Sequence, residues 1–191
     1  MKKILPFLIA LLILASCTSK PVDPVDPPAP EEDTTVVLYD TLTLDYAHYM
    51  GDDYLPSEYA GNHEVDFVFL GKGVRKENNL YKGDGTFYQV YLVTDSVDNQ
   101  LMVRPGCYIV KDTSEPMSAI AGFEPDGAYD GTLVFWIENN RVSAYSKIIQ
   151  GQVDVKGDSD DAEFTMIFTD EDDVEWRLYY KGSINVEDYR E

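Results

Sequence analysis

The sequence is poor in cysteine, in basic residues and in long apolar runs, and each shortage excludes a class of protein. Only two cysteines occur in 191 residues, which excludes a framework of several disulfides. Lys and Arg number 15 against 35 Asp and Glu, and the formal net charge of −20 disfavours binding to nucleic acid. Beyond residue 16 there is no apolar run of about 18 residues, so we expect no membrane-spanning helix.

Signatures of catalysis are also missing. The chain has no H-E-x-x-H, no G-x-S-x-G and no P-loop. Its two histidines, His48 and His63, lie near acidic residues, but we expect them to be exposed rather than a catalytic or metal-binding pair. Pairs of carboxylates carry no information here, because 35 acidic residues bring some pair together in any fold. Cys107 has no base beside it in the sequence, and we expect it to pack as a small apolar residue. The sequence therefore predicts a protein that is not an enzyme.

The first 16 residues have the order of a secretory signal. Lys2 and Lys3 precede an apolar run at residues 4–14, which is too short for a spanning helix of about 20 residues. The motif L-A-S-C at residues 14–17 resembles the lipobox of bacterial lipoproteins. The alternative is an ordinary signal peptide that is cleaved elsewhere, with Cys17 incidental.

The lipobox resemblance implies that Cys17 receives a thioether-linked diacylglycerol and becomes the first residue of the mature chain. Several acyl chains, palmitate among them, would anchor the protein to a lipid bilayer. Thr18 rather than Asp follows Cys17, which favours the outer membrane, with the domain facing the periplasm or the exterior. Cys107 would then have no partner for a disulfide within the chain.

The composition divides the chain into three segments. Residues 1–16 form the lipoprotein signal peptide. Residues 17–35 combine the lipidated cysteine with a tether of prolines and acids, which we expect to be extended. Residues 36–191 form a single domain that is long enough for a sizeable core.

The domain has the patterning of strands. Tyr alone numbers 14, and aromatic residues make up 13% of the chain. Short runs with alternating polarity or with many β-branched and aromatic residues are separated by Gly, Asp and Asn, as in sandwiches and barrels. These runs are residues 42–46, 65–69, 87–94, 107–110, 132–138, 142–149, 152–156, 163–169, 174–180 and 184–186. The prediction is an all-β fold, an antiparallel barrel or sandwich of about eight to nine strands, with one short helix at residues 116–121.

The pattern is clearest in the last third of the chain. One strand places Ile149, Gly151, Val153 and Val155 on one face. Acidic turns at residues 156–161 and 170–173 separate it from two further alternating runs, 164–168 and 176–180. These runs predict a three-stranded antiparallel meander with one buried face.

Three stretches together resemble the small lipoproteins that are common in Bacteroidetes. They are YAHYMG at 46–51, RPGCY at 104–108 and the closing meander, and the resemblance covers most of residues 44–186. Some of those lipoproteins are lipocalin-like or calycin-like barrels. The matched positions are turn and core residues, so the resemblance implies a lipid-anchored β-domain and assigns no site residues.

Two groups of residues are candidates for a site. The first is a calcium site in an acidic turn, although the spacing is not that of an EF-hand and solvated hairpin tips explain the acids equally well. Its residues are Asp158, Asp160, Asp161 and Glu163. No other cofactor is expected. The second is a set of aromatic rings that could stack on a glycan or small ligand, although alternation places about half of such rings in a core. Its main members are Trp136, Trp176, Tyr179 and Tyr180, with Tyr88 and Tyr91 in reserve.

The sequence favours a non-enzymatic binding or accessory role at the outer membrane, for a small ligand or a glycan. A ligand-binding role needs a lined cavity or an exposed aromatic row. The alternative is an interaction lipoprotein that docks onto an envelope protein, which needs an exposed apolar patch or an open strand edge. A small hydrolase comes third, and it needs a cleft that holds a perturbed histidine or carboxylate.

Overall fold

A computed structural model describes residues 37–95 and 101–190. The signal peptide, Cys17 and the tether lie outside this part, so the predictions made for them stay predictions. Thirteen strands and two 3₁₀ turns occur in the described part. The strands are β1 (Val37–Thr41), β2 (Thr43–Gly51), β3 (His63–Leu70), β4 (Val74–Glu77), β5 (Leu80–Gly83), β6 (Gly85–Thr94), β7 (Gly106–Lys111), β8 (Ser118–Ile120), β9 (Leu133–Glu138), β10 (Arg141–Lys156), β11 (Ala162–Asp170), β12 (Glu175–Gly182) and β13 (Val186–Asp188); the turns are η1 (Ser57–Tyr59) and η2 (Pro125–Gly127).

Eleven of the strands form one sheet in the order β1-β12-β11-β10-β7-β8-β6-β3-β2-β13. The remaining member, β9, pairs with both β10 and β6, so β6, β9, β10, β7 and β8 close into a five-stranded barrel with the other strands as extensions. Strands β4 and β5 form a separate hairpin. The prediction of an all-β barrel or sandwich is confirmed, but the predicted number of about eight to nine strands was too low, since the described residues form thirteen.

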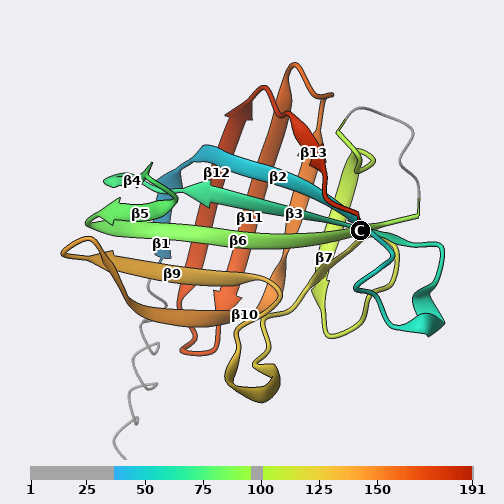
Figure 1. Cartoon of the computed structure of the whole chain (residues 1–191), viewed down its shortest axis with the longest axis horizontal. Coiled ribbons are helices and arrows are strands. Elements are labelled where there is room, and N and C mark those ends of the chain that lie inside the picture. Colours follow the sequence, from blue (N-terminus) through green and yellow to red (C-terminus); the bar gives the residue numbers. More distant parts are fainter. Residues whose placement is uncertain (1–36, 96–100, 191) are drawn as a thin grey trace, which may run out of the picture. The chain divides into compact units, whose positions relative to one another are not determined.

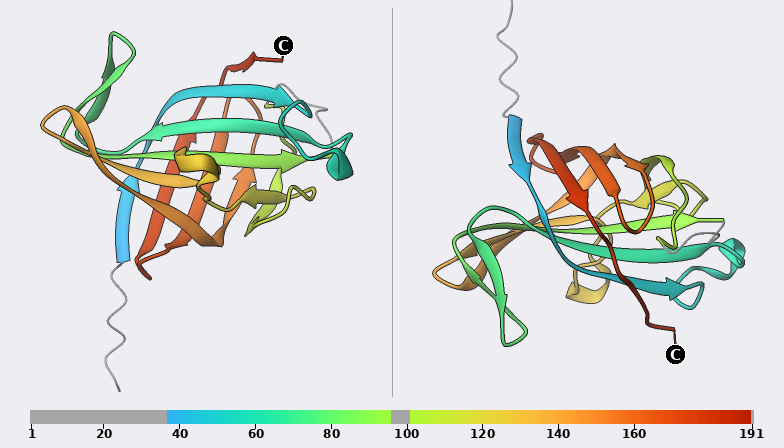
Figure 2. Two further views of the ribbon diagram at one scale, coloured as in Figure 1. Left: turned by 60° about the horizontal axis from the view of Figure 1, so that its bottom comes forward. Right: turned by 90° about the horizontal axis from the view of Figure 1, so that it is seen from above.

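The main core lies between two layers of this sheet. Figure 1 shows β2, β3 and β6 crossing in front of β11 and β12 at a steep angle. Aromatic rings from the two layers meet there: Phe67 and Phe69 of β3 lie 5.1 and 5.5 Å from the ring of Phe164 on β11. All three side chains are fully buried. Figure 2 shows the β4–β5 hairpin projecting at one end of the β2–β3–β6 layer and the η1 segment at the other end.

The predicted meander is confirmed by the pairing of β10 with β11 and of β11 with β12. One detail was wrong. A bulge between Ile148 and Gln150 shifts the register, so Ile148 is buried and Ile149 is 41% exposed. A bulge adds one residue to one strand, and this moves the preceding side chain to the opposite face.

Other details of the prediction were also wrong. Residues 116–121 contain strand β8 instead of a helix, because their backbone pairs with both β6 and β7. The β4–β5 hairpin was not predicted, and Asn78 and Asn79, both at positive φ, form its turn. Three strand pairs are parallel, namely β1 with β12, β7 with β8, and β13 with β2.

Gly151 is expected to be the least replaceable glycine of the meander. Its φ is +134°, and a Cβ there would lie 2.1 Å from the carbonyl oxygen of Ile167 on the paired strand. Gly151→Ala should lower the free energy of unfolding by about 3 kcal/mol or more, measured by urea denaturation. Gly127→Ala is the matched control: φ is +79° and nothing lies within 4 Å of the added Cβ, so only about 1–2 kcal/mol of backbone strain is expected. Equal losses for the two variants would contradict the account of the meander.

Candidate functional site

Strand β3 is buried on both of its faces. Val65, Phe67 and Phe69 point into the main core. The opposite face carries Val68 and Leu70 in a second apolar cluster. Glu64 and Asp66 continue this second face and are 5% and 9% exposed. Two side chains that are two residues apart on a strand lie on the same side, so the fold buries this pair of acidic side chains together.

Loops from distant parts of the sequence provide the cover. The segment before η1 and the segments that flank β8 and η2 enclose a cavity of about 830 Å³ over the acidic pair. We call this cavity the acidic pocket. Asn62 donates a hydrogen bond from Nδ2 to the carbonyl of Ser114 at 3.0 Å, which joins two of the loops. Phe123 and Asp130 exchange two backbone hydrogen bonds that close the η2 loop, and Gln89 of β6 donates to the carbonyl of Gly131.

The lining of the acidic pocket combines acids with apolar and aromatic side chains. The acids are Glu64, Asp66, Asp112 and Asp130. The apolar and aromatic side chains are Met50, Tyr54, Leu55, Pro56, Tyr91, Ile120, Ala121 and Phe123. Tyr54 and Phe123 are 57% and 44% exposed, so the pocket opens to solvent beside aromatic rings. Among the described residues that line it, none is Lys, Arg or His.

The carboxyl groups of Glu64 and Asp66 lie near each other on this face of β3, and each perturbs the pKa of the other. Burial raises the pKa of Glu64 to about 7. Burial and the neighbouring Glu64 raise the pKa of Asp66 well above its usual range. Desolvation disfavours the charged form of a carboxyl group, and two neighbouring carboxyl groups cannot both ionise easily. The pair therefore holds a shared proton at pH values where exposed carboxylates have lost theirs.

One atom of the pair has no partner. Asp66 Oδ1 is buried and accepts no hydrogen bond from any described residue. In the described part of the chain, the other buried side-chain atoms without a partner are the hydroxyl oxygens of Thr132 and Ser146, and neither residue lines the acidic pocket. A buried acceptor without a donor costs about 1–3 kcal/mol, so its presence calls for an explanation.

Tyr91 is an aromatic residue of the pocket lining next to the acidic pair. It lies opposite Asp66 in the register of β6 with β3. Burial, followed by the nearby Asp66 and Asp130, raises the pKa of Tyr91, so its hydroxyl stays protonated and can donate. In the sequence analysis Tyr91 was only an additional aromatic candidate, and in the structure it lines the acidic pocket.

The four leading aromatic candidates are not brought together on one surface. Trp176 and Tyr180 are 2% and 5% exposed and belong to the main core. Trp136 packs its ring edge-on against Trp176 at 5.5 Å. Tyr179 is 38% exposed, but it points to the opposite face of β12. Trp176 and Tyr180 are therefore too buried to contact a ligand.

The acidic turn that was a candidate calcium site has local partners. Asp158 Oδ1 accepts hydrogen bonds from the backbone N–H groups of Asp160 and Asp161. Lys181 forms ion pairs with Asp161 and Glu163 at 3.3 and 3.9 Å. Within residues 37–95 and 101–190, no group of three or more His, Cys, Asp or Glu side chains is arranged to hold a metal ion.

The two histidines and Cys107 do not line the acidic pocket, although His48 lies opposite Asp66 in the register of β2 with β3. His63 Nδ1 is hydrogen-bonded to the hydroxyl of Tyr49 at 2.8 Å. The ring of His48 stacks between Tyr46 and Tyr189, with 4.0 Å between ring centroids on each side. Cys107 is exposed, so the prediction that it packs as a small apolar residue was wrong. The alternation of β7 buries Tyr108 and Val110 and turns Cys107 and Ile109 outward.

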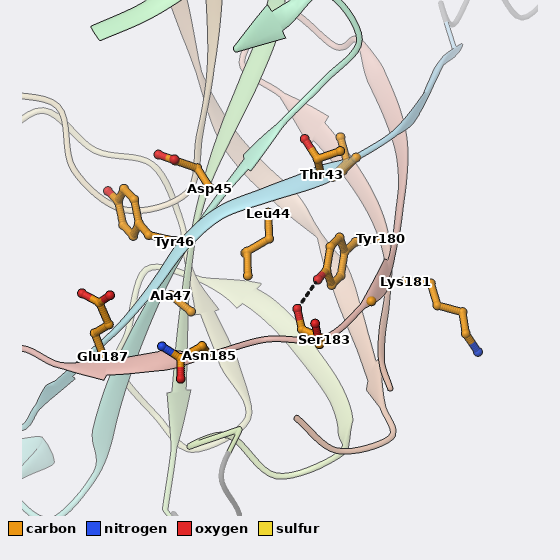
Figure 3. A pocket seen from close by; sticks show the side chains of 12 residues that line it. Thr43, Leu44, Asp45, Tyr46, Ala47, Tyr180, Lys181, Ser183, Asn185 and Glu187 are labelled. Atoms are coloured by element: carbon orange, nitrogen blue, oxygen red, sulfur yellow. Dashed lines mark hydrogen bonds between the residues drawn. The ribbon is translucent and has the colours of Figure 1, made fainter. Parts of the chain in front are cut away.

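A second, more polar cleft lies between β2 and the chain that follows β12. Figure 3 shows Thr43, Asp45, Lys181, Asn185 and Glu187 around it, with the hydroxyl of Tyr180 donating to the carbonyl of Ser183. Its volume is about 580 Å³. None of the described side chains that line it has a buried atom without a partner. The acidic pocket is therefore the better candidate for a site.

Comparisons of the chain with protein-family models, with curated proteins and with solved structures found no match. The resemblance to Bacteroidetes lipoproteins accordingly stays a prediction from sequence. The described residues include no helix of the length and apolarity needed to cross a membrane.

Proposed function

We propose that the protein is a lipid-anchored binding protein of the outer membrane that holds a small ligand in the acidic pocket, without catalysing a reaction. The observation that carries this proposal is the Asp66 carboxyl group, which lines an open, partly apolar cavity and has one buried oxygen without a hydrogen-bond partner. A stable fold gains nothing from this arrangement by itself, since buried acids without a counter-charge lower stability. Perturbed acids in a cavity are typical of functional sites.

The shape of the pocket supports binding of a small molecule. Its volume of about 830 Å³ falls within the usual range of about 300–1,000 Å³ for ligand sites. Apolar and aromatic walls with a small number of polar groups are also typical of such sites.

A screen of small molecules tests the proposed binding role. The full-length chain would be titrated with a fragment library while backbone amide resonances are followed by NMR. We expect a subset of fragments to shift the amides of Asp66, Tyr91 and Phe123. Filling the pocket with Ala121→Trp should remove these shifts, whereas the exposed variant Ile167→Trp on β11 should keep them. A library that shifts only residues outside the pocket would contradict the proposal.

The proposed anchor rests on the sequence around Cys17. Cys17→Ser should abolish acylation, so the protein should move completely from the membrane fraction to the soluble fraction in the native host. Cys107→Ser, which changes the exposed thiol of β7, should leave membrane association unchanged. Mass spectrometry of the N-terminal peptide checks the modification directly. An unacylated Cys17 in membrane-bound protein would refute the anchor.

One observation favours docking onto an envelope protein as a second function. Strand β13 pairs with β2 only at Ala47, His48 and Tyr49, so no strand in the described part pairs with this edge of β2 at residues 43–46. This edge borders the second cleft (Figure 3). An open edge can accept a strand from a partner. Crosslinking from a photoreactive residue at Thr43 would capture such a partner.

A further inference from the structure

The acidic pocket carries four carboxyl groups and no opposite charge. Glu64, Asp66, Asp112 and Asp130 all line it, and none of them takes part in an ion pair between described residues. Elsewhere in the same chain, acids of similar strands are paired, as Asp45 is with Lys76 at 2.9 Å. A cavity that collects one sign of charge attracts ligands of the opposite sign.

The unpaired oxygen of Asp66 indicates which hydrogen-bonding group the ligand needs. Asp66 lines the cavity, and its Oδ1 is a buried acceptor with no donor among the described residues. An N–H or O–H group of a ligand that reaches the Asp66 carboxyl group would supply a donor there. An N–H group that carries positive charge would in addition balance the charge of the pair, and charge-assisted hydrogen bonds are about twice as strong as neutral ones.

The rest of the lining specifies the body of the ligand. Leu55, Ile120 and Phe123 present apolar surface, and Tyr54 and Phe123 are exposed at the opening. A bare divalent cation would leave these walls empty, and no group of three metal-ligating side chains exists among the described residues. An anionic ligand would be repelled by the acids.

We propose that the ligand of the acidic pocket is a small organic amine: a protonated nitrogen that donates to Asp66 and Glu64, on an aromatic or aliphatic body that packs against Leu55, Ile120 and Phe123. This inference rests on the proposed binding function and narrows it to one ligand class. Hydroxyl-rich sugars are a poorer match, because they would satisfy the acceptor without balancing the charge.

Binding of an ammonium group is coupled to release of a proton. The positive charge stabilises the ionised form of the pair, so the proton shared by Glu64 and Asp66 passes to the solvent. Affinity should therefore rise as the pH increases through the range in which the free pair titrates. The groups that face the pair are all acids, phenols or one imidazole: Tyr46 and His48 of β2, Tyr91 of β6, and Asp112 and Asp130 of the loops.

Three probe molecules of similar size test how the charge of the ligand's head group affects binding. Phenethylamine, phenethyl alcohol and phenylacetate carry the same ring with a positive, neutral or negative head. Each would be titrated into the full-length chain at pH 8 while the amides of Asp66 and Tyr91 are followed by NMR. We expect the amine to bind about ten-fold or more tightly than the alcohol, and phenylacetate not to bind. The affinity of the amine should fall about ten-fold between pH 8 and pH 5.5, a range in which the amine itself stays protonated.

Matched variants assign the preference to the buried pair. Glu64→Gln/Asp66→Asn should reduce the amine affinity to that of the alcohol, and the alcohol affinity should change little. Asp158→Asn, which removes one exposed charge from the turn between β10 and β11, is the control and should keep the full preference. Thermal unfolding of each variant confirms that it is folded.

The outcomes distinguish the ligand class from the binding function. Equal affinities for the amine and the alcohol, with shifts at Asp66, would overturn the amine and leave the pocket as a binding site. An amine preference that survives in Glu64→Gln/Asp66→Asn would overturn the role of the pair. No shift at the pocket from any of the three probes would overturn the amine class, and the broader fragment screen then decides on the pocket itself.

Discussion

Asp170→Ala is expected to lower the free energy of unfolding by about 3–5 kcal/mol, the largest effect of a single substitution that the structure indicates. The Asp170 side chain is 1% exposed and accepts three hydrogen bonds. Its Oδ2 accepts from the indole N–H of Trp176 at 2.9 Å, and its Oδ1 accepts from the backbone N–H groups of Asp172 and Val174, both at 3.0 Å. The alanine variant leaves all three donors without this acceptor.

The same contacts explain why the turn between β11 and β12 has its shape. Backbone bonds between Asp170 and both Val174 and Asp173 close the turn, and Asp173 has a φ of 60°. Asp172→Ala in the same turn is the control, because this side chain is exposed and should change stability by less than about 0.5 kcal/mol. Urea denaturation followed by tryptophan fluorescence measures both. A loss below about 1 kcal/mol for Asp170→Ala would show that the buried carboxylate does not organise this end of the sheet.

The second large effect concerns the acidic pair. We expect the folded protein to lose about 3 kcal/mol of stability between pH 4.5 and pH 8 through Glu64 alone, with a further loss through Asp66. The folded state raises the pKa of Glu64 to about 7 from an ordinary value of 4.5. Between these values the folded chain keeps a proton that the unfolded chain has released, so stability falls as the pH rises. The contribution is fully present below about pH 4.5 and lost above about pH 7.

The comparison with Glu64→Gln/Asp66→Asn isolates this contribution. A net charge of −20 makes the general repulsion grow with pH in both proteins, so the difference between their free energies of unfolding cancels that term. The variant should be more stable than the wild type at pH 8, and its advantage should shrink toward pH 5. Urea titrations of both proteins at pH 5, 6, 7 and 8 give the difference between their free energies of unfolding at each pH. A difference that is constant with pH would mean that the pair ionises normally in the fold.

The meander could be predicted because its alternation is simple. Phe164, Met166 and Phe168 face the main core and the polar residues between them face outward, which is the pattern of a sheet with one covered face. The bulge at Ile148 could not be predicted, because one extra residue in a strand leaves no mark in an apolar run.

The acidic pocket was missed for a different reason. In β3, Glu64 and Asp66 alternate with core residues, and an alternating polar residue normally indicates a face in water. The loops that bury this face come from residues 54–56 and 112–130, and local patterning does not show where they pack. A signal was nevertheless present: Val68 and Leu70 continue the same face with apolar residues, which indicates that this side of β3 is covered.

The number of aromatic residues in the sequence did not predict which of them are available to a ligand. Trp176 and Tyr180 stand at alternate positions of β12 with Leu178 between them, and all three belong to the main core. The alternation therefore predicted their burial, while their number suggested a ligand surface. Tyr91, in contrast, shares its strand face with Phe87, and only the register with β3 places it opposite Asp66.

The proposed ligand site depends on a Glu64–Asp66 pair that holds a proton near neutral pH in the wall of an open pocket. A ¹³C NMR titration of the side-chain carboxyl groups in the full-length chain tests this most directly, with Glu64→Gln and Asp66→Asn used to assign the two resonances. We predict that the Glu64 resonance titrates with a midpoint near pH 7 and that the Asp66 resonance titrates well above its ordinary range. Midpoints near pH 4 for both groups would contradict the buried, proton-sharing pair, and with it the proposed ligand site.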